Sequence, residues 1–109
     1  MSYYVYMLKS GVKKTITYVG YTNNLKKRII LHNSGKGAKF TKGRTWKLIY
    51  KEVYKSKSKA ISREYYIKKN RKFRDKIKKE YKWKFLFYYH TRKTFLQNIQ
   101  EQYPFLLIQ

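Results

Sequence analysis

YYVYMLK at residues 3–9 and TITYVGY at residues 15–21 are the two stretches that decide the fold of this chain. Both are short and rich in aromatic and β-branched residues, which is typical of β-strands. The segment between them, SGVKK at residues 10–14, is polar and contains a glycine, as hairpin loops commonly do. The sequence therefore predicts an antiparallel hairpin at the start of the chain.

The expected pairing of this hairpin brings two tyrosines together. If the hairpin is centred near Val12, Tyr6 lies opposite Tyr18 and Leu8 lies opposite Ile16. Side chains of directly opposite residues project from the same face of a sheet. Tyr6 and Tyr18 are therefore expected side by side on one face, in a register that a shift of one residue would undo.

The segment after the hairpin has the pattern of an amphipathic helix. Asn23 or Asn24 can cap its N-terminus, and Gly35 is a natural stop at its C-terminus. Four residues recur with helical spacing and form one stripe: Leu25, Arg28, Ile29 and His32. The side that carries Arg28 and His32 is therefore expected to face the body of the protein.

The sequence downstream completes a small α+β pattern. WKLIYKEVY at residues 46–54 predicts a third strand. A second helix is expected from Ser56 or Ser58 to about Lys69, with further basic helical sequence to about Lys84. The order strand, strand, helix, strand, helix predicts a small three-stranded antiparallel sheet flanked by helices.

The length of 109 residues fits one domain. No internal repeat or linker divides the chain, so we expect one domain over residues 1–80. Residues 81–109 are expected to form an aromatic and basic extension without a separate domain. The N-terminus lacks the pattern of a secretory signal, and no apolar run approaches the length of a membrane span. These features predict an intracellular protein.

The charge of the chain indicates a polyanionic partner. Lys and Arg number 28 against 5 Asp and Glu, for a formal charge of +23. Such an imbalance causes self-repulsion unless a polyanion shares the surface. Nucleic acid is the leading partner, because Lys and Arg contacts to phosphate release counterions. An anionic membrane would need a long basic amphipathic helix with a clean apolar face, and the tyrosine-rich strands do not supply one.

The composition also limits the metal chemistry. The chain has no cysteine and only two histidines, His32 and His90, which excludes thiolate sites and multi-histidine zinc sites. Any metal here would be a hard, oxygen-ligated ion such as Mg²⁺. No pattern predicts a small-molecule cofactor, and nothing in the sequence sets an oligomeric state.

Two pairs of residues are candidates for chemistry, and each also has an ordinary structural role. Tyr6 and Tyr18 can be a packed cross-strand aromatic pair, or their hydroxyls can orient or deprotonate a water. Arg28 and His32 lie four residues apart on one side of a helix. Arg28 can be part of a solvated basic run and His32 a helix-end histidine favoured by the dipole. Alternatively, the guanidinium can bind a phosphate in bidentate fashion.

Glu64 is one of only five acidic residues in the chain, and it lies in or beside the apolar stripe of its helix. Its ordinary role is an ion pair with Lys68 at spacing i, i+4. Its functional role is to hold one hard cation together with water and substrate phosphate, as is normal for Mg²⁺. Spacing alone leaves the two roles evenly balanced.

The basic loop GKGAKFTKGR at residues 35–44 lacks the spacing of a Walker A loop. Contact with the backbone of a nucleic acid is the more natural interpretation. The residues expected to make such contacts in this loop and on the second helix are Lys36, Lys39, Lys42, Arg44, Arg63, Lys68 and Lys69.

Taken in order, these segments resemble the GIY-YIG endonuclease superfamily. YVY at residues 4–6 and YVG at residues 18–20 resemble the paired GIY and YIG motifs. NLKKR at residues 24–28 resembles the first helix of that family. The stretch HNSGKGAKFTKGR at residues 32–44 resembles the small stand-alone bacterial members. AISRE at residues 60–64 resembles the helix that carries the metal ligand.

The resemblance implies a role for each candidate residue. Tyr6 would act as the general base or position the attacking water, and Tyr18 would assist it near the scissile phosphate. Arg28 would neutralise charge on the phosphoryl oxygens, and His32 would orient a group or relay a proton. Glu64 would hold a single Mg²⁺ or Mn²⁺ ion that stabilises the leaving oxygen.

The function implied is hydrolysis of DNA phosphodiester bonds in one step, in repair, recombination or mobile-element processing. The substrate class expected is DNA, including branched or single-strand-containing forms. The alternative is a non-catalytic nucleic-acid-binding protein that retains the fold. Tyr4 stands where the first motif has glycine. The expected location is the nucleoid-associated cytoplasm of a bacterium, or the matrix or stroma for an organelle-encoded chain.

Overall fold

The computed structural model describes residues 1–11 and 14–82. Its elements are β1 (Tyr3–Ser10), β2 (Ile16–Thr22), α1 (Leu25–Asn33), the 3₁₀ turn η1 (Lys39–Thr41), β3 (Lys47–Tyr54) and α2 (Lys57–Lys69). Residues 71–82 are also helical. A first compact unit covers Met1–Ile77, and a second begins at Lys78. The predicted extension from residue 83 onward lies outside the described residues, and the predicted domain limit at residue 80 stays a prediction.

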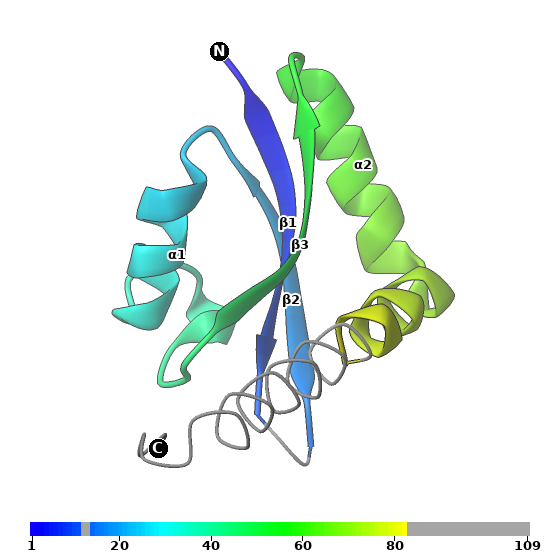
Figure 1. Cartoon of the computed structure of the whole chain (residues 1–109). Helices are drawn as coiled ribbons and strands as arrows, with labels where there is room; N and C mark the ends of the chain where they lie inside the picture. The colour runs from blue at the N-terminus through cyan, green and yellow to red at the C-terminus, as the bar shows by residue number, and fades with distance from the viewer. Residues whose placement is uncertain (12–13, 83–109) are drawn as a thin grey trace, which may run out of the picture. The chain divides into compact units, whose positions relative to one another are not determined.

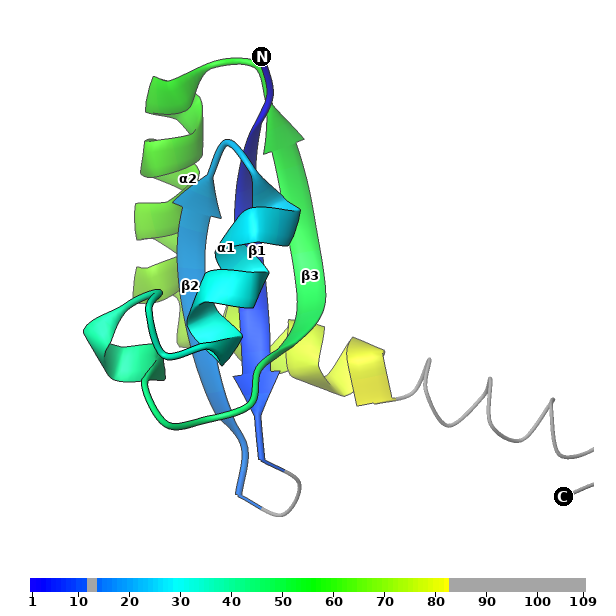
Figure 2. The same cartoon turned by 90° about the vertical axis from the view of Figure 1, so that its left-hand side faces the viewer.

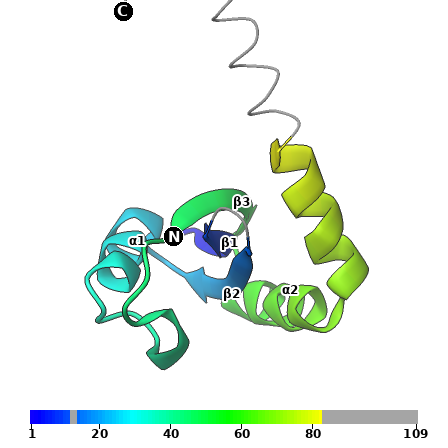
Figure 3. The ribbon, with the colours of Figure 1, turned by 90° about the horizontal axis from the view of Figure 1, so that it is seen from below.

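The three strands form one antiparallel sheet in the order β2-β1-β3 (Figure 1). Helix α1 covers one face of this sheet and α2 covers the other, which the view from below makes plain (Figures 1 and 3). Because β1 is central and covered on both faces, four successive residues are buried: Val5, Tyr6, Met7 and Leu8. The predicted α+β fold, a three-stranded antiparallel sheet flanked by helices, is confirmed. No helix in the described part of the chain is long and apolar enough to cross a membrane.

The expected register of the hairpin was wrong by two residues. Tyr6 is paired with Gly20, and Tyr18 is paired with Leu8. The loop is centred one residue later than Val12, which moves every partner by two positions. Because side chains alternate between faces with a period of two, an even shift keeps each side chain on its face. Tyr6 and Tyr18 therefore remain on the same face as diagonal neighbours.

Each face of the sheet has its own hydrophobic core. On the α2 face, Val5 and Met7 of β1 pack with Ala60 and Ile67 of α2. On the α1 face, Tyr6 and Leu8 pack with the buried Trp46, and Leu25 and Ile29 of α1 close this cluster. The alternation along β1 thus assigns Tyr6 to the side of the molecule that α1 covers.

Side-chain caps set the ends of the helices where the sequence predicted them. The side chain of Asn24 accepts a hydrogen bond from the backbone N–H of Lys27 at the start of α1. Ser56 caps α2 in the same way. Gly35 follows α1 with a φ of +80°, which a residue with a side chain rarely adopts. Asn70 ends α2 and caps the helical residues that follow, because its side chain accepts from the N–H of Phe73.

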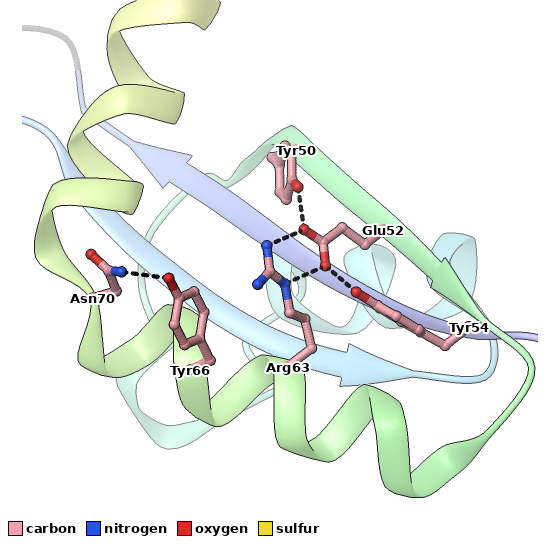
Figure 4. Close-up of polar contacts among 6 residues, drawn as sticks. All are labelled: Tyr50, Glu52, Tyr54, Arg63, Tyr66 and Asn70. Carbon is pink, nitrogen blue, oxygen red and sulfur yellow. Dashed lines mark hydrogen bonds and ion pairs between the residues drawn. The ribbon is translucent and has the colours of Figure 1, made fainter.

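A carboxylate-centred network joins β3 to α2 (Figure 4). Glu52 accepts two hydrogen bonds from Arg63, at 2.8 Å from Nε and 3.0 Å from Nη2. The hydroxyls of Tyr50 and Tyr54 donate to the same carboxylate. Burial alone would raise the pKa of Glu52, but these hydrogen bonds together hold it below its usual value of 4.5. Burial and the contact with Glu52 raise the pKa of Tyr50 to about 12.

Arg63 was expected to contact DNA, but its side chain is engaged within the protein. Its guanidinium is engaged by Glu52 and lies over the rings of Tyr66 and Phe73, at 4.8 and 5.0 Å from their centroids. An arginine used in this way fixes α2 against β3. This placement gives no support to the predicted contact between Arg63 and nucleic acid.

Replacing Glu52 with glutamine is expected to lower the free energy of unfolding by about 1–3 kcal/mol, because charge-assisted hydrogen bonds are lost and Arg63 keeps an unpaired charge. Urea denaturation of wild type and Glu52→Gln measures this difference. Asp75→Asn is the matched control, because Asp75 faces Arg71 at 3.9 Å in an exposed pair. Exposed pairs contribute about 0–1 kcal/mol. An equal loss in both variants would contradict a structural role for the Glu52 network.

Candidate active site

The site forms where β1 and β2 meet α1 and the loop that contains η1 (Figure 2). The ring centroids of Tyr6 and Tyr18 are 6.3 Å apart. His32, on the last turn of α1, places its ring 5.8 Å from Tyr6 and 4.9 Å from Tyr18. His32 is fully buried. The helical stripe predicted from the sequence thus brings His32 into contact with both tyrosines.

A buried chain of hydrogen bonds runs from Tyr6 through His32 to Thr41. The Tyr6 hydroxyl lies 2.7 Å from Nε2 of His32, and Nδ1 of His32 lies 2.9 Å from Oγ1 of Thr41. Thr41 donates its hydroxyl proton to the carbonyl oxygen of Ala38 at 2.9 Å. A hydroxyl has one proton, so Thr41 must accept from Nδ1–H. Nε2 is then the acceptor, and Tyr6 is the donor to it.

Two glycines make this arrangement possible. A Cβ at Gly20 would lie 2.6 Å from the hydroxyl oxygen of Tyr6, and a Cβ at Gly37 would lie 2.3 Å from Nδ1 of His32. Both distances are far below ordinary contact. The phenol of Tyr6 therefore lies across the backbone of β2 at Gly20. The glycine of the YVG motif is required by this close approach.

Arg28 adds a fixed positive charge beside the tyrosines. It lies one turn before His32 on α1, and its guanidinium interacts with the hydroxyls of Tyr6 and Tyr18. The contact with Tyr6 is the largest influence on Arg28 and raises the pKa of the guanidinium. Arg28 also lines an open pocket with Tyr21, Asn23 and Lys57 at the edge of β2. A cation held at an open edge can meet an anionic ligand.

The protonation states of Tyr6 and His32 follow from their surroundings. Burial raises the pKa of Tyr6 to about 12, against the opposing influence of Arg28. Tyr6 therefore carries its proton at neutral pH. Burial, together with the charge of Arg28, lowers the pKa of His32 below 6.5. His32 is consequently a neutral acceptor, and the charged helix-end histidine favoured by the dipole does not describe it.

Glu64 belongs to α2, which covers the face of the sheet opposite to α1 (Figure 3). Its carboxylate contributes to the raised pKa of Tyr6 as the smallest of five influences. Its Oε1 lies 2.5 Å from Nζ of Lys68, and its side chain is only 15 % exposed. The ordinary i, i+4 ion pair weighed from the sequence is therefore present. Tyr18 and Lys68 line one pocket at the edge of β2 together with Thr17, Val19 and Arg74.

The other residues expected to contact nucleic acid differ in their surroundings. The cationic residues of the loop are exposed: Lys36, Lys39, Lys42 and Arg44. On α2, Lys68 is held by Glu64, and Lys69 is exposed with its ammonium 5.5 Å from the ring of Tyr65. In residues 1–11 and 14–82, no group of three or more His, Asp or Glu side chains gathers that could hold a metal ion.

Sequence reasoning missed Thr41, which fixes the orientation of the His32 ring. Thr41 is fully buried, and its carbonyl oxygen accepts a hydrogen bond from Nε1 of Trp46 at 2.8 Å. It lies nine residues beyond His32, in a loop whose charge and glycine content predicted only contacts with nucleic acid. The one available signal was a lone threonine between Phe40 and Lys42 in a basic loop.

His32 is expected to make stability depend on pH. The unfolded chain takes up a proton near pH 6.5, whereas the folded chain takes it up only at lower pH. The contribution of His32 is therefore complete above pH 6.5 and is lost as the pH falls through the interval below it. Urea denaturation across this interval should show a steeper loss of unfolding free energy in wild type than in His32→Gln. Parallel curves would contradict a buried neutral His32.

The comparison with known families decides the class of this chain. The family model of the GIY-YIG catalytic domain matches residues 2–82. The chain belongs to the GIY-YIG family. Membership gives this GIY-YIG protein the catalytic domain of a nuclease family, as its motifs predicted.

Relatives of this GIY-YIG protein are bacterial proteins named UPF0213. One from Clostridium perfringens is 57 % identical over 67 residues, which cover 61 % of this chain and 70 % of the relative. One from Staphylococcus haemolyticus is 51 % identical over 67 residues, covering 61 % and 79 %. A solution NMR structure of a UPF0213 protein from Bacillus halodurans has a TM-score of 0.44 at 38 % identity, covering 71 % of this chain and 82 % of that one.

Proposed function

We propose that this GIY-YIG protein is a metal-dependent DNA endonuclease that hydrolyses phosphodiester bonds in one step. The observation that carries the proposal is the buried hydrogen-bond chain from Tyr6 through His32 to Thr41, with Arg28 against the Tyr6 hydroxyl. A cross-strand tyrosine pair needs no such chain for packing. A group that must pass on a proton needs an oriented acceptor behind it.

Tyr6 and His32 together provide the proton path in this proposal. A hydroxyl with a pKa of about 12 is protonated at rest and cannot accept a proton until it gives up its own. As water attacks phosphorus, Tyr6 takes the proton of the water and its own proton moves to Nε2 of His32. The bond from phosphorus to the leaving oxygen breaks, and that oxygen takes up a proton from solvent, while Nδ1–H stays hydrogen-bonded to Thr41. After the product leaves, His32 gives its extra proton back through Tyr6 to solvent, which restores the resting state.

Arg28 and Tyr18 act on the phosphate in this scheme. Arg28 stays charged, and its interaction with the Tyr6 hydroxyl supports a place for that charge beside the attacking water. A fixed donor stabilises the charge that develops on phosphoryl oxygens without reorganisation during the reaction. The ring of Tyr18 lies 4.9 Å from that of His32, and Tyr18 also lines the pocket that contains Lys68 and Arg74. In this scheme its hydroxyl assists at the same phosphate.

Glu64 is the proposed ligand of one Mg²⁺ or Mn²⁺ ion. Its carboxylate already neutralises a cation, the Lys68 ammonium, in a largely covered position. One carboxylate with the remaining positions left to water and phosphate is a normal set for Mg²⁺. When bound, such an ion stabilises charge on the leaving oxygen. The Lys68 ammonium must leave the Glu64 carboxylate when the ion binds, so Lys68 competes with the ion for Glu64. Lys68 can contact DNA only after this ion pair is broken.

The exposed cations of the loop are the proposed contacts to the DNA backbone. Lys36, Lys39 and Lys42 lie in the loop that supplies Thr41 to the site, so phosphates bound there flank the scissile one. Lys69 extends the basic surface on α2. Bacterial relatives support the cytoplasm of a bacterium over an organelle as the location, with a role in repair, recombination or mobile-element processing.

Incubation of supercoiled, branched and linear DNA with the purified protein tests the proposal. We expect nicking with Mg²⁺ and none with a chelator in its place. Glu64→Ala, purified in the same way, controls for contaminating nucleases and should show no metal-dependent product. Binding without cleavage by wild type would instead identify the alternative, a nucleic-acid-binding protein that retains the fold.

A further inference from the structure

Phe40 is an exposed aromatic residue that touches the candidate active site. It lies in the middle of η1 and is 59 % exposed, although burial of a phenylalanine is normally favourable. Its ring is stacked on Tyr18, with centroids 6.3 Å apart and planes 21° from parallel. Ile30 and Val53 are exposed to a similar extent, at 59 % and 56 %, but neither has an aromatic ring.

The ring of Phe40 is held firmly. Its neighbour Thr41 is fully buried, bonded to His32 through its side chain and to Trp46 through its carbonyl oxygen. The indole of Trp46 also lies 6.2 Å from the ring of Phe40. An aromatic surface that is both exposed and pre-positioned loses little freedom when it binds a ligand.

The surroundings of Phe40 select the chemistry of that ligand. Lys39 and Lys42 flank it along the chain, and both are exposed. Cationic side chains beside an exposed aromatic ring are the features that bind single-stranded nucleic acid, because the cations follow the phosphates and the ring stacks on a base. In a duplex each base is already stacked and paired, so only an unpaired base can reach the ring.

We propose that Phe40 stacks on an unpaired base of the DNA strand that is cut, next to the scissile phosphate. This inference rests on the proposed nuclease function and names its substrate class: DNA with an unpaired nucleotide at the cleavage point, as at a gap, a flap or a junction. Contact between Phe40 and Tyr18 places that base within one or two nucleotides of the site. Fully paired duplex can use the lysines of the loop but not the ring.

Fluorescence anisotropy in a chelator tests this inference without any cleavage. The probes are a labelled single strand of about 12 nucleotides, within the usual site sizes, and the same strand in a blunt duplex. Phe40→Ala and Phe40→Leu are expected to weaken single-strand binding by about tenfold and to leave duplex binding unchanged within about twofold. Phe40→Trp should retain single-strand affinity. Leucine keeps apolar packing against Tyr18 but lacks a planar face, so it separates stacking from loop structure.

Ile30→Ala is the matched control, because Ile30 on α1 is a hydrophobic residue as exposed as Phe40, at 59 %, but has no ring to stack on a base. Single-strand affinity should be the same in Ile30→Ala and wild type. The inference is overturned if wild type does not bind the single strand, if Phe40→Leu binds it like wild type, or if both probes weaken equally. Wild type that binds through Phe40 but never cuts DNA with Mg²⁺ would refute the nuclease function and leave the base contact standing.

Discussion

Tyr6→Phe should lower the single-turnover rate of DNA cleavage by about 10²–10⁴-fold, the usual contribution of a positioned acid or base. Phenylalanine fills the same buried volume but cannot take a proton from the attacking water. It also leaves Nε2 of His32 without the donor that lies 2.7 Å away in wild type. The rate is measured with enzyme in excess over labelled DNA, so that product release does not mask the chemical step.

A matched control separates loss of the hydroxyl from loss of folding. Tyr65→Phe removes a hydroxyl from an exposed tyrosine on α2 and should leave the rate unchanged. Tyr6→Phe should keep its DNA affinity in a chelator, because the phosphate contacts of the loop are untouched. Cleavage by Tyr6→Phe within about threefold of wild type would remove Tyr6 from the proton path, given the size expected for such a group.

Arg28→Ala should lower the same rate by about 10²–10³-fold, as removal of one fixed donor to a developing oxyanion commonly does. The loss should fall on the rate at saturating protein and not mainly on DNA affinity, because the charge acts where negative charge develops. Arg28→Lys should recover only part of the rate, since an ammonium cannot bind two phosphoryl oxygens in the bidentate geometry.

Lys27→Ala is the control for net charge at this position. Lys27 is the neighbour of Arg28 on α1, and its side chain is exposed. Its replacement removes one positive charge and should change the rate by less than about threefold, with a small loss of affinity at low salt. Equal effects of Lys27→Ala and Arg28→Ala would mean that Arg28 acts only through the general field of the protein.

Local patterns were enough to predict the helices and strands, and also that Tyr6, Tyr18 and His32 lie on the same side of the sheet. Strand composition, the caps at Asn24 and Ser56 and the stop at Gly35 depend on neighbouring residues, so they can be read along the chain. The stripe of α1 gave the inward direction of His32 for the same reason. The expected register was wrong by two residues, but an even shift leaves every side chain on its own face of the sheet. The prediction that Tyr6 and Tyr18 share a face is therefore confirmed.

Contacts between distant segments were beyond such patterns. The bond between His32 and Thr41 depends on how the loop folds back over α1, and Gly37 makes room for it. The pairing of Glu52 with Arg63 joins a strand to a helix eleven residues later. Charge and spacing gave no reason to separate Arg63 from the other basic residues of α2, and only the packed structure shows its guanidinium to be engaged.

The surroundings of Tyr6 also sharpen its proposed role. The positive charge of Arg28 beside Tyr6 would by itself lower the pKa of the phenol. Burial outweighs this influence and raises the pKa to about 12. A tyrosine in that state needs a neutral base behind it, and His32 has the lowered pKa that such a base requires. The raised pKa of Tyr6 keeps the hydroxyl protonated, and the lowered pKa of His32 keeps the imidazole neutral, so that Tyr6 can donate its proton to His32.

The dependence of cleavage on Mg²⁺ in wild type and Glu64→Gln tests the central claim most directly. Single-turnover rates are measured over a titration of Mg²⁺, with Asp75→Asn as the control for loss of one exposed acidic charge. Wild type and Asp75→Asn should share one saturable metal dependence, and Glu64→Gln should show no metal-stimulated rate at any concentration used. A Glu64→Gln curve that overlies that of wild type would contradict the claim that this site cuts DNA with a cation held by Glu64.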